Sequence, residues 1–163
     1  MTLITAPPHY IELPHNPDAE KQFIAALLAA AFAGNNSPIK RYSETIKPTD
    51  FYKSGTQNFY IRILELEAQG RPVDEYLLVD SFRNDPHYQL YRDYADKLKP
   101  VTVGVATHFG KIILEYSLRR KAIQEIAGIL EDVQNLSLPL EEVLTKNIHI
   151  SEEIIEREVS ACL

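Results

Sequence analysis

Residues 107–134 read THFGKIILEYSLRRKAIQEIAGILEDVQ, and no other segment constrains the architecture as strongly. Its apolar side chains recur at alternating steps of three and four, which predicts one helix with an apolar seam along one side. Such a helix would be roughly 42 Å long, whereas a compact globule of this chain length is only about 40 Å across. The helix therefore either crosses the domain or projects from it. The seam comprises Phe109, Ile112, Tyr116, Arg119, Ile123, Ile126, Leu130 and Val133.

The periodicity leaves two interpretations open. The helix either forms the core of a monomeric bundle, or it projects and needs a partner to cover its seam. Arg119 interrupts the apolar pattern and is equally ambiguous. Its side chain either reaches water from the edge of the seam, or pairs across an interface with a carboxylate such as Glu115 or Glu125 of another helix.

The composition is that of one soluble domain with its own core: 163 residues, 45% hydrophobic and 25% charged. The longest apolar run, around residues 23–33, is too short for the ~20 residues that a bilayer requires, so we expect no membrane association. The N-terminal residues lack the pattern of a signal peptide. Cys162 is the one cysteine, which argues against disulfides. A cytoplasmic location is expected.

Charge and motifs argue against catalysis and against strong nucleic-acid binding. The formal net charge is −6 and the basic residues are dispersed, so we expect little direct contact with nucleic acid. There is no GxxxxGK[ST] loop, so this chain alone should not hydrolyse ATP. His149 with Glu152 and Glu153 is only a weak hint of a metal site. We therefore expect no catalytic residues, no cofactor and no metal in this chain.

The remaining segments predict an all-α fold in three parts. Residues 1–15 contain three prolines and should form an extended N-terminal arm. Residues 16–100 should form a globular head of about five helices, and residues 101–163 an antiparallel helical hairpin. The head helices are expected from Asn16 to Gly34, from Ser37 to before Pro48, from about Thr56 to Gln69, from Glu75 to about Arg83, and from Asp85 to Leu98.

Several boundaries depend on particular residues. Asn16 and Asp74 have the side chains of helix N-caps. The segment 101–105 is either a short strand, by its β-branched content, or the lead-in to the long helix with Thr102 as its cap; we prefer the lead-in. Beyond a turn at residues 135–139, residues 140–160 should form one or two helices that return along the long helix.

The ordered landmarks of the chain resemble the N-terminal domain of DnaB-type replicative DNA helicases. The resemblance covers about residues 14 to 135. It rests on Pro14-His15-Asn16-Pro17-Asp18-Ala19-Glu20, on Lys47-Pro48-Thr49-Asp50-Phe51-Tyr52, on the helix from Phe59 to Leu66, on Gly70-Arg71-Pro72-Val73-Asp74, and on Tyr116-Ser117-Leu118-Arg119-Arg120-Lys121-Ala122-Ile123.

The resemblance implies a non-catalytic helical head and hairpin, in which hairpins of neighbouring subunits pair and the dimers close into a collar on a hexameric ring. It also implies docking of primase or a helicase loader. ATP and Mg²⁺ would belong to a separate motor domain, and this chain stops at Leu163 before any such domain. The implied self-association interface comprises Phe109, Ile112, Ile113, Tyr116, Arg119, Arg120, Ile123, Ile126, Leu130 and Val133.

The sequence also departs from the family pattern. Ala25-Ala26 replaces an expected glycine, Thr56-Gln57-Asn58 stands where a histidine is expected, and a Gly-Gly-x-x-Tyr-Leu element survives only loosely between Tyr88 and Tyr94. Two alternatives to the helicase domain are an unrelated all-α adaptor that binds another protein through the same seam, and a small metal protein that uses His149 and the C-terminal glutamates.

Overall fold

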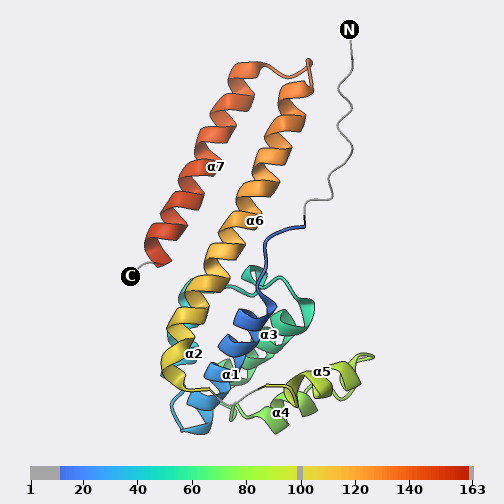
Figure 1. Ribbon diagram of the computed structural model, residues 1–163, viewed down its shortest axis with the longest axis vertical. Helices are drawn as coiled ribbons and strands as arrows, with labels where there is room; N and C mark the ends of the chain where they lie inside the picture. The colour runs from blue at the N-terminus through green and yellow to red at the C-terminus, as the bar shows by residue number, and fades with distance from the viewer. Residues whose placement is uncertain (1–11, 99–100, 162–163) are drawn as a thin grey trace.

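The computed structural model describes residues 12–98 and 101–161, and within them the fold is all-α, as the sequence predicts. A head is followed by a long antiparallel hairpin (Figure 1). The expected arm lies mostly in residues 1–11, outside the described part. The elements are α1 (Pro17–Phe32), α2 (Ser37–Thr45), η1 (Pro48–Asp50), α3 (Ser54–Ala68), α4 (Glu75–Asp80), α5 (Tyr88–Ala95), η2 (Val103–Val105), α6 (Ala106–Gln134) and α7 (Leu140–Ala161).

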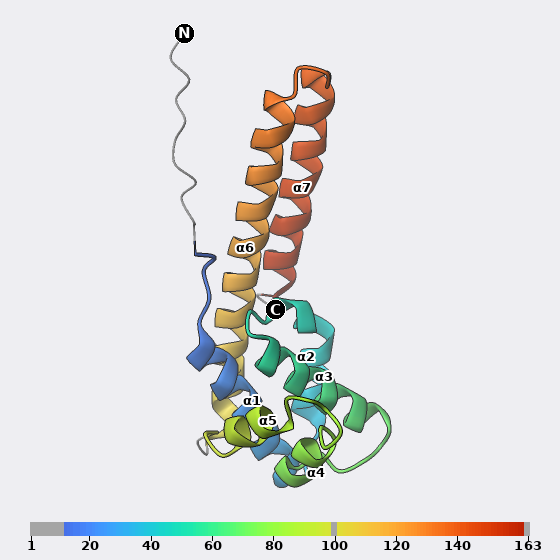
Figure 2. The same ribbon diagram turned by 90° about the vertical axis from the view of Figure 1, so that its right-hand side faces the viewer.

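The long helix α6 belongs to both parts of the molecule. Its buried residues run from Ala106 to Arg120, where it packs on α1 and η1. Beyond Arg120 no described residue of α6 is fully buried, and this half stands clear of the head beside α7 (Figures 1 and 2). The helix therefore projects from the globule, as the second interpretation of the seam expects; a partner that covers the seam stays a prediction. The return along it is a single helix, α7.

Local sequence signals set the N-terminal ends of the first and fourth helices as predicted. The Asn16 side chain accepts a hydrogen bond from the Ala19 N–H at 3.0 Å, and Asp74 accepts one from the Leu77 N–H at 2.8 Å. Gly34 ends the α1 turn with φ 74°, a conformation that favours glycine.

Three expected boundaries and one expected cap are wrong. Helix α4 ends at Asp80 instead of about Arg83, and α5 ends at Ala95 instead of Leu98. Helix α5 begins at Tyr88, because the Asp85 carboxylate binds the His87 N–H at 2.7 Å and holds a turn in place of a first helical turn. Residues 103–105 form η2, so the strand alternative fails. Thr102 does not cap α6 through its side chain; its backbone carbonyl accepts from the Val105 N–H.

The core of the head lies between α1, α3 and the N-terminal half of α6. Phe23, Phe59 and Tyr60 are fully buried in it. Gly110 allows α6 to approach this core closely: a Cβ there would lie 2.8 Å from Cδ1 of Ile46 and 3.3 Å from the Phe23 ring. The head thus packs against the N-terminal half of α6, and α7 packs against the C-terminal half.

Candidate functional site

The hairpin carries a row of uncovered apolar side chains on each helix. On α6, Ile126 is 64% exposed and Leu130 60%, and Val133 follows one turn later. On α7, exposed apolar residues recur at steps of four and seven, from Leu140 to Ile155. We call these residues the hairpin face: Ile126, Leu130 and Val133 of α6 with Leu140, Leu144, Ile148 and Ile155 of α7.

Helix geometry places both rows on one side of the hairpin. Successive residues of a helix are about 100° apart. On α6, the exposed apolar row therefore lies about 90° around the helix axis from the half-buried side that meets α7. On α7, the exposed apolar row lies about 100° around the helix axis from the buried Val143. The two rotations have the same sense when each helix is viewed from its own N-terminus. Because the helices are antiparallel, both rows turn toward the same side.

The opposite side of the hairpin is polar, and an ion pair across it joins α6 to α7. Lys146 of α7 binds Asp132 of α6 with Nζ 3.2 Å from Oδ2. Both residues lie round their helices in the sense opposite to the hairpin face. Val143, which is 5% exposed, packs between the helices. The hairpin therefore has an apolar side and a charged side, as expected of two amphipathic helices that lack a covering partner on one side.

The predicted interface residues divide into three groups in the structure. Arg119, Ile126, Leu130 and Val133 are exposed, and Phe109, Ile112, Tyr116 and Ile123 are half-buried. Ile113 and Arg120 are buried in their own chain, at 3% and 8% exposure. The N-terminal residues of the seam pack against the head and do not form a free helix face. The α7 residues of the hairpin face were not among the predicted interface residues, although their spacing is visible in the sequence.

Arg119 pairs within its own helix. Its guanidinium binds Glu115 one turn earlier, with Nη2 2.7 Å from Oε1, and both side chains are exposed. Such an exposed pair contributes little to stability. The exposed side chain agrees with the interpretation that Arg119 reaches water, although the intrahelical pair with Glu115 was not expected.

Arg120 instead clamps three segments together below the hairpin. Its guanidinium donates to the backbone carbonyls of Pro14 and Asp50 and lies over the Tyr52 ring, 5.6 Å from the ring centroid. Burial lowers the pKa of Arg120, while the nearby carboxylates of Glu20 and Asp50 oppose the shift. The arginine remains charged at neutral pH because its ordinary pKa lies so far above 7.

Asp50 is the centre of the same junction. It is 1% exposed, and its carboxylate accepts hydrogen bonds from the Lys47 backbone N–H at 2.7 Å and from Ser117 Oγ at 2.6 Å. Arg157 of α7 completes the set, 2.6 Å from Oδ2. The sequence contained Asp50 in a family motif, but nothing in its spacing could indicate a partner 107 residues away.

A second buried carboxylate organises the chain next to this junction. Glu20 of α1 is 3% exposed and accepts from the backbone N–H groups of Tyr52 and Lys53 and from the Thr56 hydroxyl. The Tyr52 ring stacks on His15 at 4.2 Å between centroids. These bonds satisfy the polar groups of the turn from η1 into α3, so both carboxylates are structural in this geometry.

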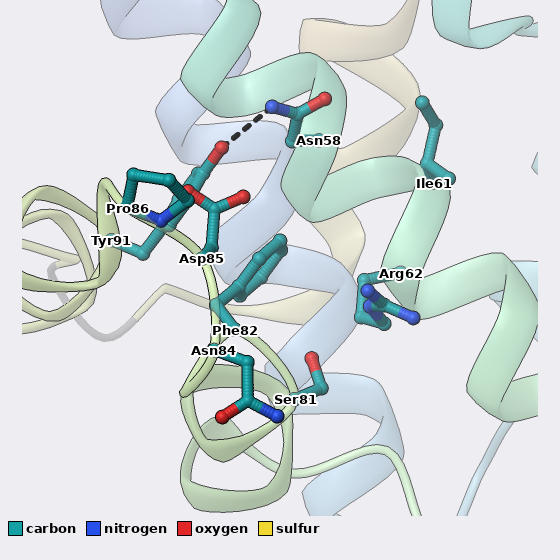
Figure 3. Close-up of a pocket in the computed structure, with 9 residues that line it drawn as sticks. All are labelled: Asn58, Ile61, Arg62, Ser81, Phe82, Asn84, Asp85, Pro86 and Tyr91. Carbon is teal, nitrogen blue, oxygen red and sulfur yellow. Dashed lines mark hydrogen bonds between the residues drawn. The ribbon is translucent and has the colours of Figure 1, made fainter.

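The head also has a cleft of about 420 Å³ between α3 and the segment that leads into α5 (Figure 3). Phe82 and Tyr91 stack in its wall, 4.1 Å between centroids, and the Asn58 amide donates to the Tyr91 hydroxyl at 2.6 Å. The Arg62 guanidinium at its edge is paired with Glu65. Asn58, Tyr91 and Arg62 are thus already paired, so the cleft does not indicate a particular ligand chemistry.

Neither metal ligation nor membrane insertion is indicated in the described ranges. No group of three or more His, Cys, Asp or Glu side chains there converges in the manner of a metal site. His149 lies 3.6 Å from Glu152 on the surface of α7. Among the described helices, none combines the length and apolar character needed to cross a bilayer.

Comparison with known proteins gives one family and one fold. The family described as "DnaB-like helicase N terminal domain" matches residues 12–115, which is 104 of the 163 residues. The crystal structure of the N-terminal domain of DnaB helicase from Mycobacterium tuberculosis superposes with a TM-score of 0.72 at 21% sequence identity, covering 88% of this chain and 99% of that one. No curated protein sequence gives a match.

Proposed function

Because the chain belongs to the DnaB-like helicase N-terminal domain family, we propose that it is a non-catalytic assembly domain that pairs with a second copy of itself through the hairpin face. The family match ends inside α6, at residue 115. The proposal for the hairpin therefore depends on its own geometry. The observation that carries it is the alignment of two exposed apolar rows on one side of α6 and α7.

The size of the hairpin face suits a protein partner. The hairpin presents a side about 30 Å long and two helices wide, about 20 Å, hence a footprint of about 600 Å². That is near the area of about 800 Å² that each partner buries in an ordinary stable interface. The footprint is at the upper end of the largest apolar patches of ordinary monomers, about 300–600 Å², and patches of this size are often functional.

A second copy fits this surface better than an unrelated protein. An isologous contact requires a self-complementary patch, and two identical apolar rows meet this condition without any matching of charges. Packing the two hairpins face to face would produce a four-helix arrangement with apolar residues inside, in the manner of helical bundles. Arg119 and Glu115 are already paired and could lie at its rim.

The proposal extends to a role in DNA replication. As part of a replicative helicase, the domain would join subunits into a collar and offer the head to primase or a helicase loader. This role implies a cytoplasmic protein. ATP and Mg²⁺ would act in a separate motor domain, and residues 1–163 would serve assembly.

The test is the mass of the protein in solution. Light scattering at ~100 μM, well above a micromolar Kd, should give at least a dimer for the wild type. Ile126→Asp should give a monomer, because it places a carboxylate in the middle of the apolar contact. Gln124→Asp is the matched control, since it adds the same charge to an exposed position on another side of α6. A monomeric wild type would overturn the proposal.

A further inference from the structure

The C-terminal part of α7 is tied to the head through Arg157. Its Nη2 lies 2.8 Å from Oδ1 and 2.6 Å from Oδ2 of Asp50. Helix α7 otherwise packs mainly along α6. The bond therefore joins the returning helix directly to η1, a segment of the head more than one hundred residues earlier in the chain.

The two ends of this ion pair are held very differently. Asp50 is 1% exposed and binds the Lys47 backbone N–H and the Ser117 hydroxyl, neither of which belongs to α7. The side chain of Arg157 is 32% exposed. It can leave Asp50 and be hydrated, whereas the carboxylate cannot follow it into water. The Asp50 carboxylate is thus held in place by the head, and the Arg157 side chain of α7 is the partner that can detach.

Detachment would leave the buried Asp50 carboxylate without the cation that binds its oxygens directly. The Arg120 guanidinium lies in the same junction, but it donates to the backbone carbonyl of Asp50 and to that of Pro14. Removing one partner of a buried ion pair is strongly unfavourable. The attached position of α7 is therefore favoured by a specific electrostatic contact at one end, while the apolar contact with α6 holds the rest of the helix.

We propose that the Asp50–Arg157 pair is a latch that fixes the C-terminal half of α7 against the head and so sets the angle between hairpin and head. When the latch opens, this half of α7 separates from the head while the hairpin tip stays paired through Val143 and through Lys146 with Asp132. The consequence that the latch orients the hairpin face for assembly rests on the proposed function; the latch itself does not.

Distance measurement within one chain tests the latch. Spin labels at Gln69→Cys on the head and Glu152→Cys on α7, in a Cys162→Ser background, report this separation by double electron–electron resonance. Labelled protein is diluted into excess unlabelled protein, so that each distance comes from a single chain. The wild type should give one narrow distribution. Arg157→Gln should broaden it and shift it to longer distance, and Arg157→Lys should restore most of the narrow component.

The matched control is Lys146→Gln, which removes another cation of α7 from another aspartate but leaves the head untouched. It should keep the wild-type distribution. Arg157→Gln is used only if it leaves helix content and hydrogen exchange in α1 and α3 unchanged. Otherwise Ser117→Ala takes its place, because this change removes only one hydrogen bond to the Asp50 carboxylate. An Arg157→Gln distribution equal to that of the wild type, in a folded protein, would overturn the latch.

The two proposals fail separately in these experiments. The label distance is intramolecular and does not depend on the mass measured by light scattering. A monomeric wild type with a distance that depends on Arg157 would remove the proposed assembly role and keep the latch. A dimer whose label distance ignores Arg157→Gln would do the reverse.

Discussion

Tyr60 donates its phenolic hydrogen to the backbone carbonyl of Ile46 across 3.0 Å, in the interior of the head where both residues are shielded from water. Tyr94 lies on the other side of the same core, against Phe59, and its buried hydroxyl has no hydrogen-bond partner within the described part of the chain. Tyr60 is fully buried and Tyr94 is partly buried, but both hydroxyls are shielded from water and only that of Tyr60 has a partner among the described residues.

Replacing each tyrosine by phenylalanine should move stability in opposite directions. Tyr60→Phe removes a buried hydrogen bond and leaves the Ile46 carbonyl unpaired, so it should lower the free energy of unfolding by about 1–2 kcal/mol. Tyr94→Phe removes a hydroxyl that already lacks a partner, and should be neutral or stabilising by up to about 1 kcal/mol. Urea denaturation followed by circular dichroism measures both. Equal losses in the two variants would contradict the assignment.

Stability should also fall at alkaline pH. Burial raises the pKa of both Tyr60 and Tyr94 well above the ordinary value of 10.0, with smaller contributions from Asp50 and Glu20 respectively. Above pH 10 the unfolded chain therefore loses protons that the folded chain keeps, so the folded state becomes less stable as pH rises. Each tyrosine contributes a slope of about 1.4 kcal/mol per pH unit.

The urea midpoint at several pH values between about 9 and 11 measures this slope. The wild type should lose stability across the range, and the variant that carries both Tyr60→Phe and Tyr94→Phe should lose less. The comparison isolates the two buried phenols from the remaining tyrosines and lysines. Parallel curves for the two proteins would show that these phenols do not cause the alkaline loss.

Two glycines of α6 should respond oppositely to alanine. Gly128→Ala meets no atom within 4 Å and should stabilise the helix by about 0.5–1 kcal/mol, the usual gain in a helix interior. Gly110→Ala gains the same helix propensity but drives a Cβ to 2.8 Å from Ile46 and 3.3 Å from Phe23. Repacking of that buried contact should cost about 1–3 kcal/mol. Thermal unfolding of both variants checks the ranking, and a Gly110→Ala protein as stable as Gly128→Ala would contradict it.

The parts of the fold that the sequence predicts are those with local physical causes. The Asn16 and Asp74 caps bind backbone groups three residues away, so composition and spacing suffice to find them. The length of α6 follows from uninterrupted periodicity, whereas its projection was one of two alternatives that the dimensions left open. The late start of α5 was missed because Asp85-Pro86 is as compatible with a capped turn as with a first helical turn.

The parts that were missed depend on contacts between distant segments. Arg120 and Ile113 were expected in the self-association interface, but the head covers them, and only the packing of α6 on α1 and η1 shows this. Arg157 is an unremarkable cation on a helix surface until Asp50 is placed beside it. Likewise, the spacing of Leu140, Leu144 and Ile148 gives the period of α7 but cannot say which side of the helix α6 occupies.

The α7 half of the hairpin face gives the last prediction, because it tests whether two helices or one form the contact. Leu144→Asp adds a charge to the face on α7, and Thr145→Asp adds the same charge at the next exposed residue, about 100° round the helix and away from the face. If both rows are covered by a second copy, Leu144→Asp should weaken self-association by about 2 kcal/mol, or about 30-fold in Kd. Thr145→Asp should leave Kd within about twofold of the wild type.

Sedimentation equilibrium over a range of concentrations measures both values, with circular dichroism as a check on folding. An α6 seam acting alone would predict that neither change matters, and loss of association in both variants would point to repulsion from added charge on α7 in general.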